Sequence, residues 1–82
     1  MKNFQVARFW NSDTPASSRS GNYRTDGSKL WSYNQLIGIT NDLGEKVIYN
    51  YTNASGGTFI SSTTSNHVNL ARFYADIVLD PT

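Results

Sequence analysis

The sequence predicts an α+β domain in which a small, twisted antiparallel sheet of four to five strands packs on one C-terminal helix. Two stretches, 29–40 and 46–52, alternate apolar and polar residues with the period of two that is typical of strands. The polar residues near the C-terminus instead recur at spacings of three and four, which indicates a helix. Because the chain has 82 residues, we expect a single domain, residues 1–82.

The N-terminal part predicts a strand, a loop and a hairpin. Residues 3–10 alternate loosely, with Phe4 and Val6 on one face, and we expect a first strand there. Residues 11–21 are polar and predict a long loop. Asp26-Gly27 suits a two-residue turn, which would set Tyr23 across from Leu30 or Trp31.

The central part predicts two long paired strands. Residues 29–40 read as a single strand, and residues 46–52 as its partner. The connection "NDLGE" fits a three-residue loop with Gly44 in the left-handed conformation. Ile39 then faces Val47 and Ile37 faces Tyr49, so that the apolar faces of the two strands coincide.

A turn over 53–57 and a short strand over 58–61 lead into the predicted C-terminal helix, which Thr64 or Ser65 would cap and Pro81 would end. Arg72 and Asp76 are expected to form a surface ion pair on its polar stripe. The apolar arc of this helix is wider than one sheet face covers. Either the strands curl around the helix or a second copy of the chain covers its other flank, and we favour the homo-oligomer. The polar stripe consists of Asn69, Arg72, Asp76 and Asp80.

Composition and charge narrow the range of functions that the protein could have. The net charge is +1, which is no general footprint for nucleic acid or membranes, although the first 40 residues carry most of the basic side chains. The sequence has no cysteine and one histidine, so neither a cysteine-based nor a two-histidine metal site is expected. No segment looks long and apolar enough to span a bilayer, and we expect a cytoplasmic protein without cofactors.

No residue pattern predicts catalysis. The carboxylates are scattered over loops, turns and the helix, so none of their spacings suggests an acid–base pair. Neither a nucleophile elbow nor a glycine-rich phosphate loop is present. We therefore expect a protein that is not an enzyme.

The hydroxyl residues before the helix are the best candidate site. Ser61 to Ser65 are all serine or threonine, although one hydroxyl is enough to cap a helix. Two interpretations stay open: a capped helix preceded by a threonine-rich strand end, or a phosphate cradle formed by Thr63, Thr64, Ser65 and His67. His67 is expected to point inward or along the sheet edge, as a partly buried imidazole that bonds a backbone group. We expect it to be neutral, because the positive end of a helix discourages its protonation.

Two aromatic residues are candidates for stacking on a nucleobase. Most aromatic side chains must fill the core, but Tyr33 and Tyr51 lie toward the polar end of the sheet near Gln35. The candidate cations beside them come from the basic half of the chain and are Arg19, Arg24 and Lys29.

Four short motifs together resemble a family of small bacteriophage-encoded domains without a settled activity. The motifs are Ser32-Tyr33, Ile37-Gly38, Tyr49 to Tyr51, and Thr63-Thr64-Ser65 with His67. The resemblance covers residues 22–75. It implies a phage accessory protein that acts by binding in the host cytoplasm.

The sequence therefore predicts a non-enzymatic binding protein with three alternative partners. The first is a phosphate-bearing small molecule such as a signalling nucleotide, whose sequestration would counter a host defence. The second is a host enzyme or defence complex, which the protein would inhibit through the 11–28 loop or the surplus helix face. The third and least supported is a nucleic acid bound by the basic N-terminal half.

Overall fold

The N-terminal segment is helical. The computed structural model describes residues 1–52 and 60–81, and α1 spans Asn3–Asn11, so the strand predicted over 3–10 is wrong. Val6, Ala7 and Trp10 are fully buried, and their spacing brings them onto one helix face. The backbone N–H of Lys2 donates to Gln5 Oε1 at 2.9 Å, which closes the first turn. The error arose because loose alternation and a helical stripe both fit these few residues.

Six strands form a single mixed sheet in chain order, from β1 to β6. All neighbouring pairs are antiparallel except β5–β6, which is parallel because α2 crosses over between them. The prediction of four to five antiparallel strands was therefore too low, and it missed the parallel pair. The strands are β1 (Ala16–Ser17), β2 (Tyr23–Thr25), β3 (Leu30–Ser32), β4 (Gln35–Thr40), β5 (Lys46–Tyr49) and β6 (Ile77–Leu79).

The single strand predicted over 29–40 is a hairpin of β3 and β4. The chain reverses at residues 33–34, and Tyr33 takes the left-handed conformation with φ of 55°. The guanidinium of Arg24 donates to the Tyr33 carbonyl at 2.6 Å and holds this reversal against β2. The sequence offered no glycine here, which is why the turn was missed.

The preceding hairpin also differs from its prediction. Thr25 pairs with Leu30, so residues 26–29 form a four-residue loop in place of a two-residue turn. Tyr23 consequently lies opposite Ser32 and not opposite Leu30 or Trp31. The Asp26 carboxylate accepts the backbone N–H groups of the loop at 2.9 and 2.7 Å, and these hydrogen bonds lower its pKa.

The β4–β5 hairpin has the predicted register. Ile39 pairs with Val47, and Gly44 has a φ of 78°. A Cβ placed on Gly38 would lie 3.0 Å from Trp10 and 3.2 Å from Ile48, so this position faces the helices. By strand alternation the Ile39–Val47 pair lies on the opposite face of the sheet.

The C-terminal helix is shorter than predicted. α2 spans Ser62–Arg72, and its N-cap is Ser61, whose Oγ accepts the Thr64 N–H at 3.1 Å; the predicted cap at Thr64 or Ser65 is wrong. Residues 77–79 form β6, because the β-branched Ile77 and Val78 pair with β5. The predicted turn over 53–57 and most of the strand over 58–61 lie outside the described residues.

The predicted Arg72–Asp76 ion pair does not form. The Arg72 guanidinium donates to Asn50 Oδ1 at 3.1 Å, whereas Asp76 Oδ2 accepts the Lys46 backbone N–H at 2.8 Å. The helix ends at Arg72, so Asp76 does not follow it at helical spacing. Both side chains instead fasten the end of α2 and the start of β6 to β5.

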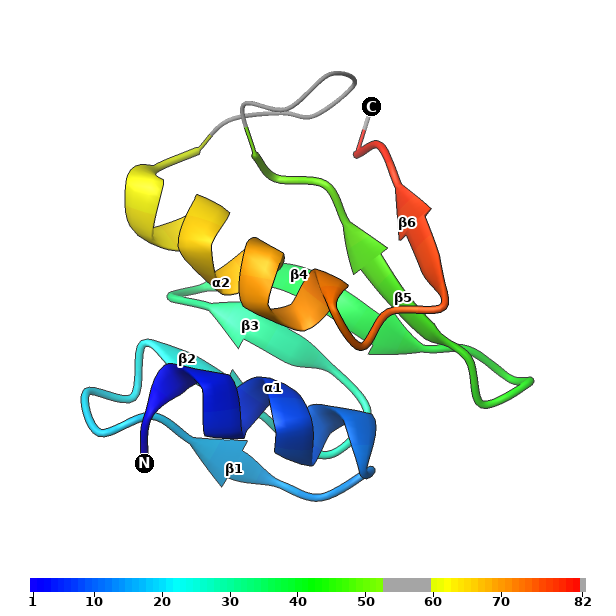
Figure 1. Ribbon diagram of the computed structural model, residues 1–82, viewed down its shortest axis with the longest axis horizontal. Helices are drawn as coiled ribbons and strands as arrows, with labels where there is room; N and C mark the ends of the chain where they lie inside the picture. The colour runs from blue at the N-terminus through cyan, green and yellow to red at the C-terminus, as the bar shows by residue number, and fades with distance from the viewer. Residues whose placement is uncertain (53–59, 82) are drawn as a thin grey trace.

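Both helices cover the same face of the sheet, as Figure 1 shows, and the main core lies between these two layers. The core residues come from α1, α2 and the four strands β2 to β5. They are Val6, Ala7, Trp10, Tyr23, Leu30, Ile37, Ile48, Val68 and Ala71. The first turn of α2 is thereby held over β3, where the candidate hydroxyl residues meet the sheet.

Candidate functional site

A chain of buried and partly buried polar side chains joins α2 and its cap to β2 and β3. We call it the α2 polar cluster, and it consists of Tyr23, Ser32, Ser61, Thr64 and His67. Ser32 Oγ lies 2.6 Å from His67 Nδ1 and 3.1 Å from Thr64 Oγ1. Ser61 Oγ donates to Thr64 Oγ1 at 3.1 Å. The cluster therefore links the cap of α2 to the sheet through its side chains.

His67 is the centre of this cluster. Its side chain points inward, as predicted, with 2% of the residue exposed, and its ring stacks on Tyr23 with 4.2 Å between the centroids. The Tyr23 hydroxyl donates to the His67 carbonyl at 2.9 Å. Burial lowers the pKa of His67 and raises that of Tyr23, so both side chains are neutral near pH 7. The imidazole bonds the side chain of Ser32. A buried histidine often bonds a backbone group instead.

The Ser32–His67 distance is one that a nucleophile and its base would have. Ser32 is nevertheless completely buried, and its hydroxyl is shared with Thr64. A substrate would have to displace β3 or α2 to reach it. We therefore interpret this pair as part of the packing between helix and sheet.

The predicted phosphate cradle is divided by burial. The side chains of Thr64 and His67 are buried and bonded within the α2 polar cluster, whereas Thr63 is exposed. Ser65 Oγ is buried and has no hydrogen-bond partner among the described residues. Only part of the hydroxyl run thus faces outward, and capping with core packing accounts for Ser61 and Thr64.

The predicted stacking residues and cations lie in three places. Tyr33 is 45% exposed, and its ring lies 6.3 Å from that of His67, so it borders the start of α2. Arg24 is close by, because it bonds the Tyr33 carbonyl and covers the Trp31 ring at 5.3 Å. Tyr51 lines a separate hollow with Gln35, Leu36, Tyr49, Asp80 and Pro81. Arg19 is exposed, and its backbone N–H donates to the Met1 carbonyl at 3.1 Å.

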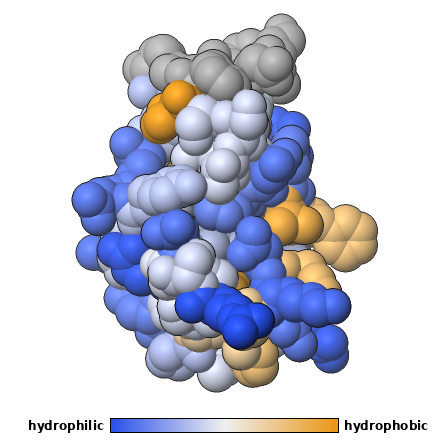
Figure 2. Space-filling view, turned by 90° about the vertical axis from the view of Figure 1, so that its left-hand side faces the viewer, coloured by the Kyte–Doolittle hydropathy of each residue, from blue (hydrophilic) through white to orange (hydrophobic). Residues whose placement is uncertain are grey.

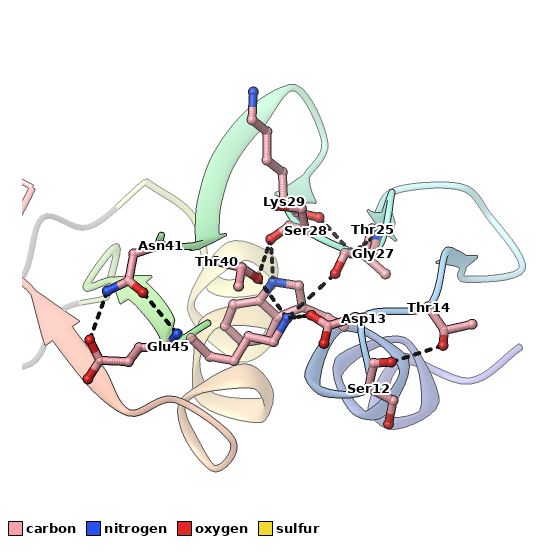
Figure 3. Close-up of polar contacts among 12 residues, drawn as sticks. Ser12, Asp13, Thr14, Thr25, Gly27, Ser28, Lys29, Thr40, Asn41 and Glu45 are labelled. Carbon is pink, nitrogen blue, oxygen red and sulfur yellow. Dashed lines mark hydrogen bonds and ion pairs between the residues drawn. The ribbon is translucent and has the colours of Figure 1, made fainter. Parts of the chain in front are cut away.

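A second polar cluster, which we did not predict, surrounds the buried ammonium of Lys46. Its Nζ donates to Asp13, to Thr40 and to the carbonyl of Gly27 at 2.6, 2.6 and 3.5 Å. Figure 3 shows these three acceptor residues close to one another. The ammonium also lies 5.3 Å from the Trp10 ring centroid. Each N–H of the ammonium has an acceptor, so this cluster fastens β5 to the end of α1 and to the β2–β3 loop.

The outer side of the helix layer is apolar. Phe4, Leu70, Phe73 and Tyr74, together with the Asn69 amide, line a hollow between α1 and α2, which we call the helix-layer surface. Phe73 is 84% exposed and Phe4 is 50% exposed. Figure 2 shows apolar side chains projecting at its right-hand edge, the side on which the helices lie.

The sequence held one signal for this surface. The apolar arc of the predicted C-terminal helix was too wide for one sheet face, and Leu70, Phe73 and Tyr74 belong to it. Phe4 was assigned to a strand, so its place beside α2 was missed. The arc as predicted does not exist, because α2 ends at Arg72 and residues 77–79 form β6, but Leu70, Phe73 and Tyr74 from it do line the hollow.

Two searches of the described residues and three comparisons found nothing further. Within residues 1–52 and 60–81, no three or more acidic, histidine or cysteine side chains gather as a metal site would require. In the same part of the chain, no helix has the length and apolar character needed to cross a membrane. Comparisons with protein families, with curated proteins and with solved structures found no match.

Proposed function

We propose that this is a non-enzymatic binding protein that docks on another protein through the helix-layer surface. The observation that carries the proposal is the exposure of Phe73, 84%, beside a half-exposed Phe4. A contiguous group of large apolar side chains on a small domain is typical of a surface that a partner covers. This is the surplus helix face that the sequence suggested for binding a host enzyme or defence complex.

The packing beneath the surface supports a preformed binding face. Val6, Ala7 and Ala71 are fully buried under it, so the two helices cannot easily turn their outer side chains inward. The Phe73 and Tyr74 rings contact each other edge to face at a centroid distance of 5.2 Å. A partner that buries these side chains gains apolar burial without first ordering the helices.

Photo-crosslinking tests the proposal. A photoreactive phenylalanine is placed at position 73 or, as the control, at position 43, where Leu43 is 83% exposed in the β4–β5 loop. We expect a discrete crosslinked protein from position 73 that is absent from position 43 and is lost when Phe4→Ser is added. Equal labelling from both positions, or labelling indifferent to Phe4→Ser, would overturn the proposal.

A small phosphate-bearing ligand is the second candidate, favoured by the position of Tyr33. This exposed ring lies 6.3 Å from the His67 ring of α2, and Arg24 is bonded to its carbonyl. Thr63, in the first turn of the same helix, is also exposed. Isothermal titration against cyclic and linear nucleotides tests it. Heat that disappears in Tyr33→Ala and persists in Phe73→Ser favours this candidate, whereas no heat from the folded wild-type chain excludes the nucleotides tested.

The remaining expectations stay predictions. A phage origin and a counter-defence role rest on the resemblance, and nucleic-acid binding rests on the basic N-terminal half. The absence of catalysis and the homo-oligomer are likewise predictions.

A further inference from the structure

We propose that the partner's contact segment is an amphipathic helix whose apolar anchors are flanked by acidic residues. This inference rests on the proposed function, because it names what the helix-layer surface recognises. Three features carry it: the charges of the two helices, the form of the hollow between them, and the distribution of the acidic residues.

The charged residues of the helix layer are all basic. Neither α1 nor α2 contains an acidic residue, whereas Arg8 lies in α1, Arg72 in α2, and Lys2 directly before α1. Arg8 follows Phe4 by four residues, so the two side chains share one face of α1. Arg8 is exposed, and its place on the Phe4 face of α1 sets a positive charge beside the apolar side chains. A segment with acidic flanks meets this rim with favourable electrostatics.

The acidic residues lie elsewhere in the molecule. All six are in loops or next to β6: Asp13, Asp26, Asp42, Glu45, Asp76 and Asp80. Asp76 is the one nearest in sequence to Phe73, and its carboxylate accepts the Lys46 backbone N–H at 2.8 Å. The negative charge of Asp76 is therefore directed to the sheet, and the helix-layer surface keeps its positive rim.

The hollow suits a helix. It lies between α1 and α2, with Phe4 on one wall and Leu70 and Phe73 on the other. An amphipathic helix places apolar side chains at spacings of three and four into such a groove. The exposed Asn69 amide adds a hydrogen-bonding group at its border.

Charge also argues against a second copy of the chain on this surface. A symmetric pair of copies places the same patch on both sides of the contact. Such a pair would bring two helix layers together that carry basic and no acidic residues, and like charges across an interface are unfavourable. The homo-oligomer expected from the sequence would have to use another surface.

The probe for this inference is a displayed library of short random peptides, selected on the immobilised full chain. We expect the enriched peptides to combine apolar residues at helical spacing with an excess of Asp and Glu. Phe73→Ser should weaken the best peptide by about thirtyfold or more, as loss of a central anchor does. Arg8→Glu should weaken it by about fivefold to tenfold and reduce its sensitivity to salt.

Matched variants and the possible outcomes separate the two proposals. Leu43→Ser and Lys29→Glu change an exposed apolar and an exposed basic residue away from the helices, and neither should alter binding. Circular dichroism and urea midpoints equal to those of the wild type show that all variants fold. Neutral or basic peptides that still depend on Phe73 overturn this inference and leave the proposed function standing. Peptides indifferent to Phe73→Ser, or self-association lost in that variant, overturn both.

Discussion

The two ends of α2 differ in what they bury. At its start, the polar residues Thr64 and His67 are inside, bonded to Ser32 of the sheet. At its end, the aromatic Phe73 lies outside, with 84% of its surface exposed. The polar end is buried and hydrogen-bonded and the apolar end is exposed, which is the reverse of what residue type alone suggests.

The largest loss of stability is expected from His67→Ala, a change within the buried polar part of α2. The change removes a fully stacked ring and leaves a cavity between α2 and β2. We expect the free energy of unfolding to fall by about 3 kcal/mol, measured by urea denaturation. Asn66→Ala, at an exposed position of the same helix, is the control and should change it by less than about 0.5 kcal/mol. Equal losses of unfolding free energy in the two variants would show that the buried polar end contributes no more to stability than an exposed position does.

Thr64→Val tests the hydroxyl alone, because valine keeps the shape of threonine. Loss of the contacts with Ser32 and Ser61 should lower the free energy of unfolding by about 1–2 kcal/mol. The neighbouring Thr63→Val is the control, since Thr63 is exposed and should tolerate the change within about 0.5 kcal/mol. If both variants were equally stable, the hydrogen bonds of the cluster would contribute nothing measurable.

The pH dependence of stability should reflect the protonation of the His67 side chain. Burial lowers its pKa below the ordinary value of 6.5, so the unfolded chain binds the proton more readily than the folded one. The stabilising effect of the neutral ring is complete above pH 6.5 and is lost as the pH falls below it. Urea denaturation between about pH 7.5 and pH 5 measures this loss. His67→Gln, which cannot titrate, should flatten the profile, and an unchanged slope would exclude His67 as its source.

The smallest effect on stability is expected from Phe73→Ser. Because this side chain is mostly exposed, the free energy of unfolding should change by less than about 0.5 kcal/mol. Leu43→Ser is the matched control at an equally exposed position. A loss above about 1.5 kcal/mol in Phe73→Ser but not in Leu43→Ser would place Phe73 in the core and remove the contrast between the two ends of α2.

Local sequence signals predicted some elements and missed others for identifiable reasons. The β4–β5 hairpin was predicted with its register, because Gly44 and two alternating strands specify it jointly. The β3–β4 reversal at Tyr33 was missed, since it depends on Arg24 bonding the Tyr33 carbonyl from another strand. The strand β6 was taken for helix, because its β-branched residues form a strand only once β5 is alongside.

The candidate site was likewise predicted in part. Helical spacing predicted that His67 points inward or along the sheet edge, and its side chain is buried. Its pKa is lowered as expected for a neutral ring, but the cause is burial and not the positive helix end. Its bond to Ser32 could not be predicted, because the two residues are 35 positions apart in the chain. The helix-layer surface required Phe4 to be helical, which the local pattern did not indicate.

The sequence by itself determined the α+β class and the β4–β5 register, because each depends on residues close together in the chain. Only the tertiary structure decided that α1 is a helix, that Ser32 joins His67, and that Phe4 meets Phe73 at one surface. The physical reason is that these features depend on which distant segments exclude water from one another. Burial of that kind arises only when the two helices and the sheet are packed together.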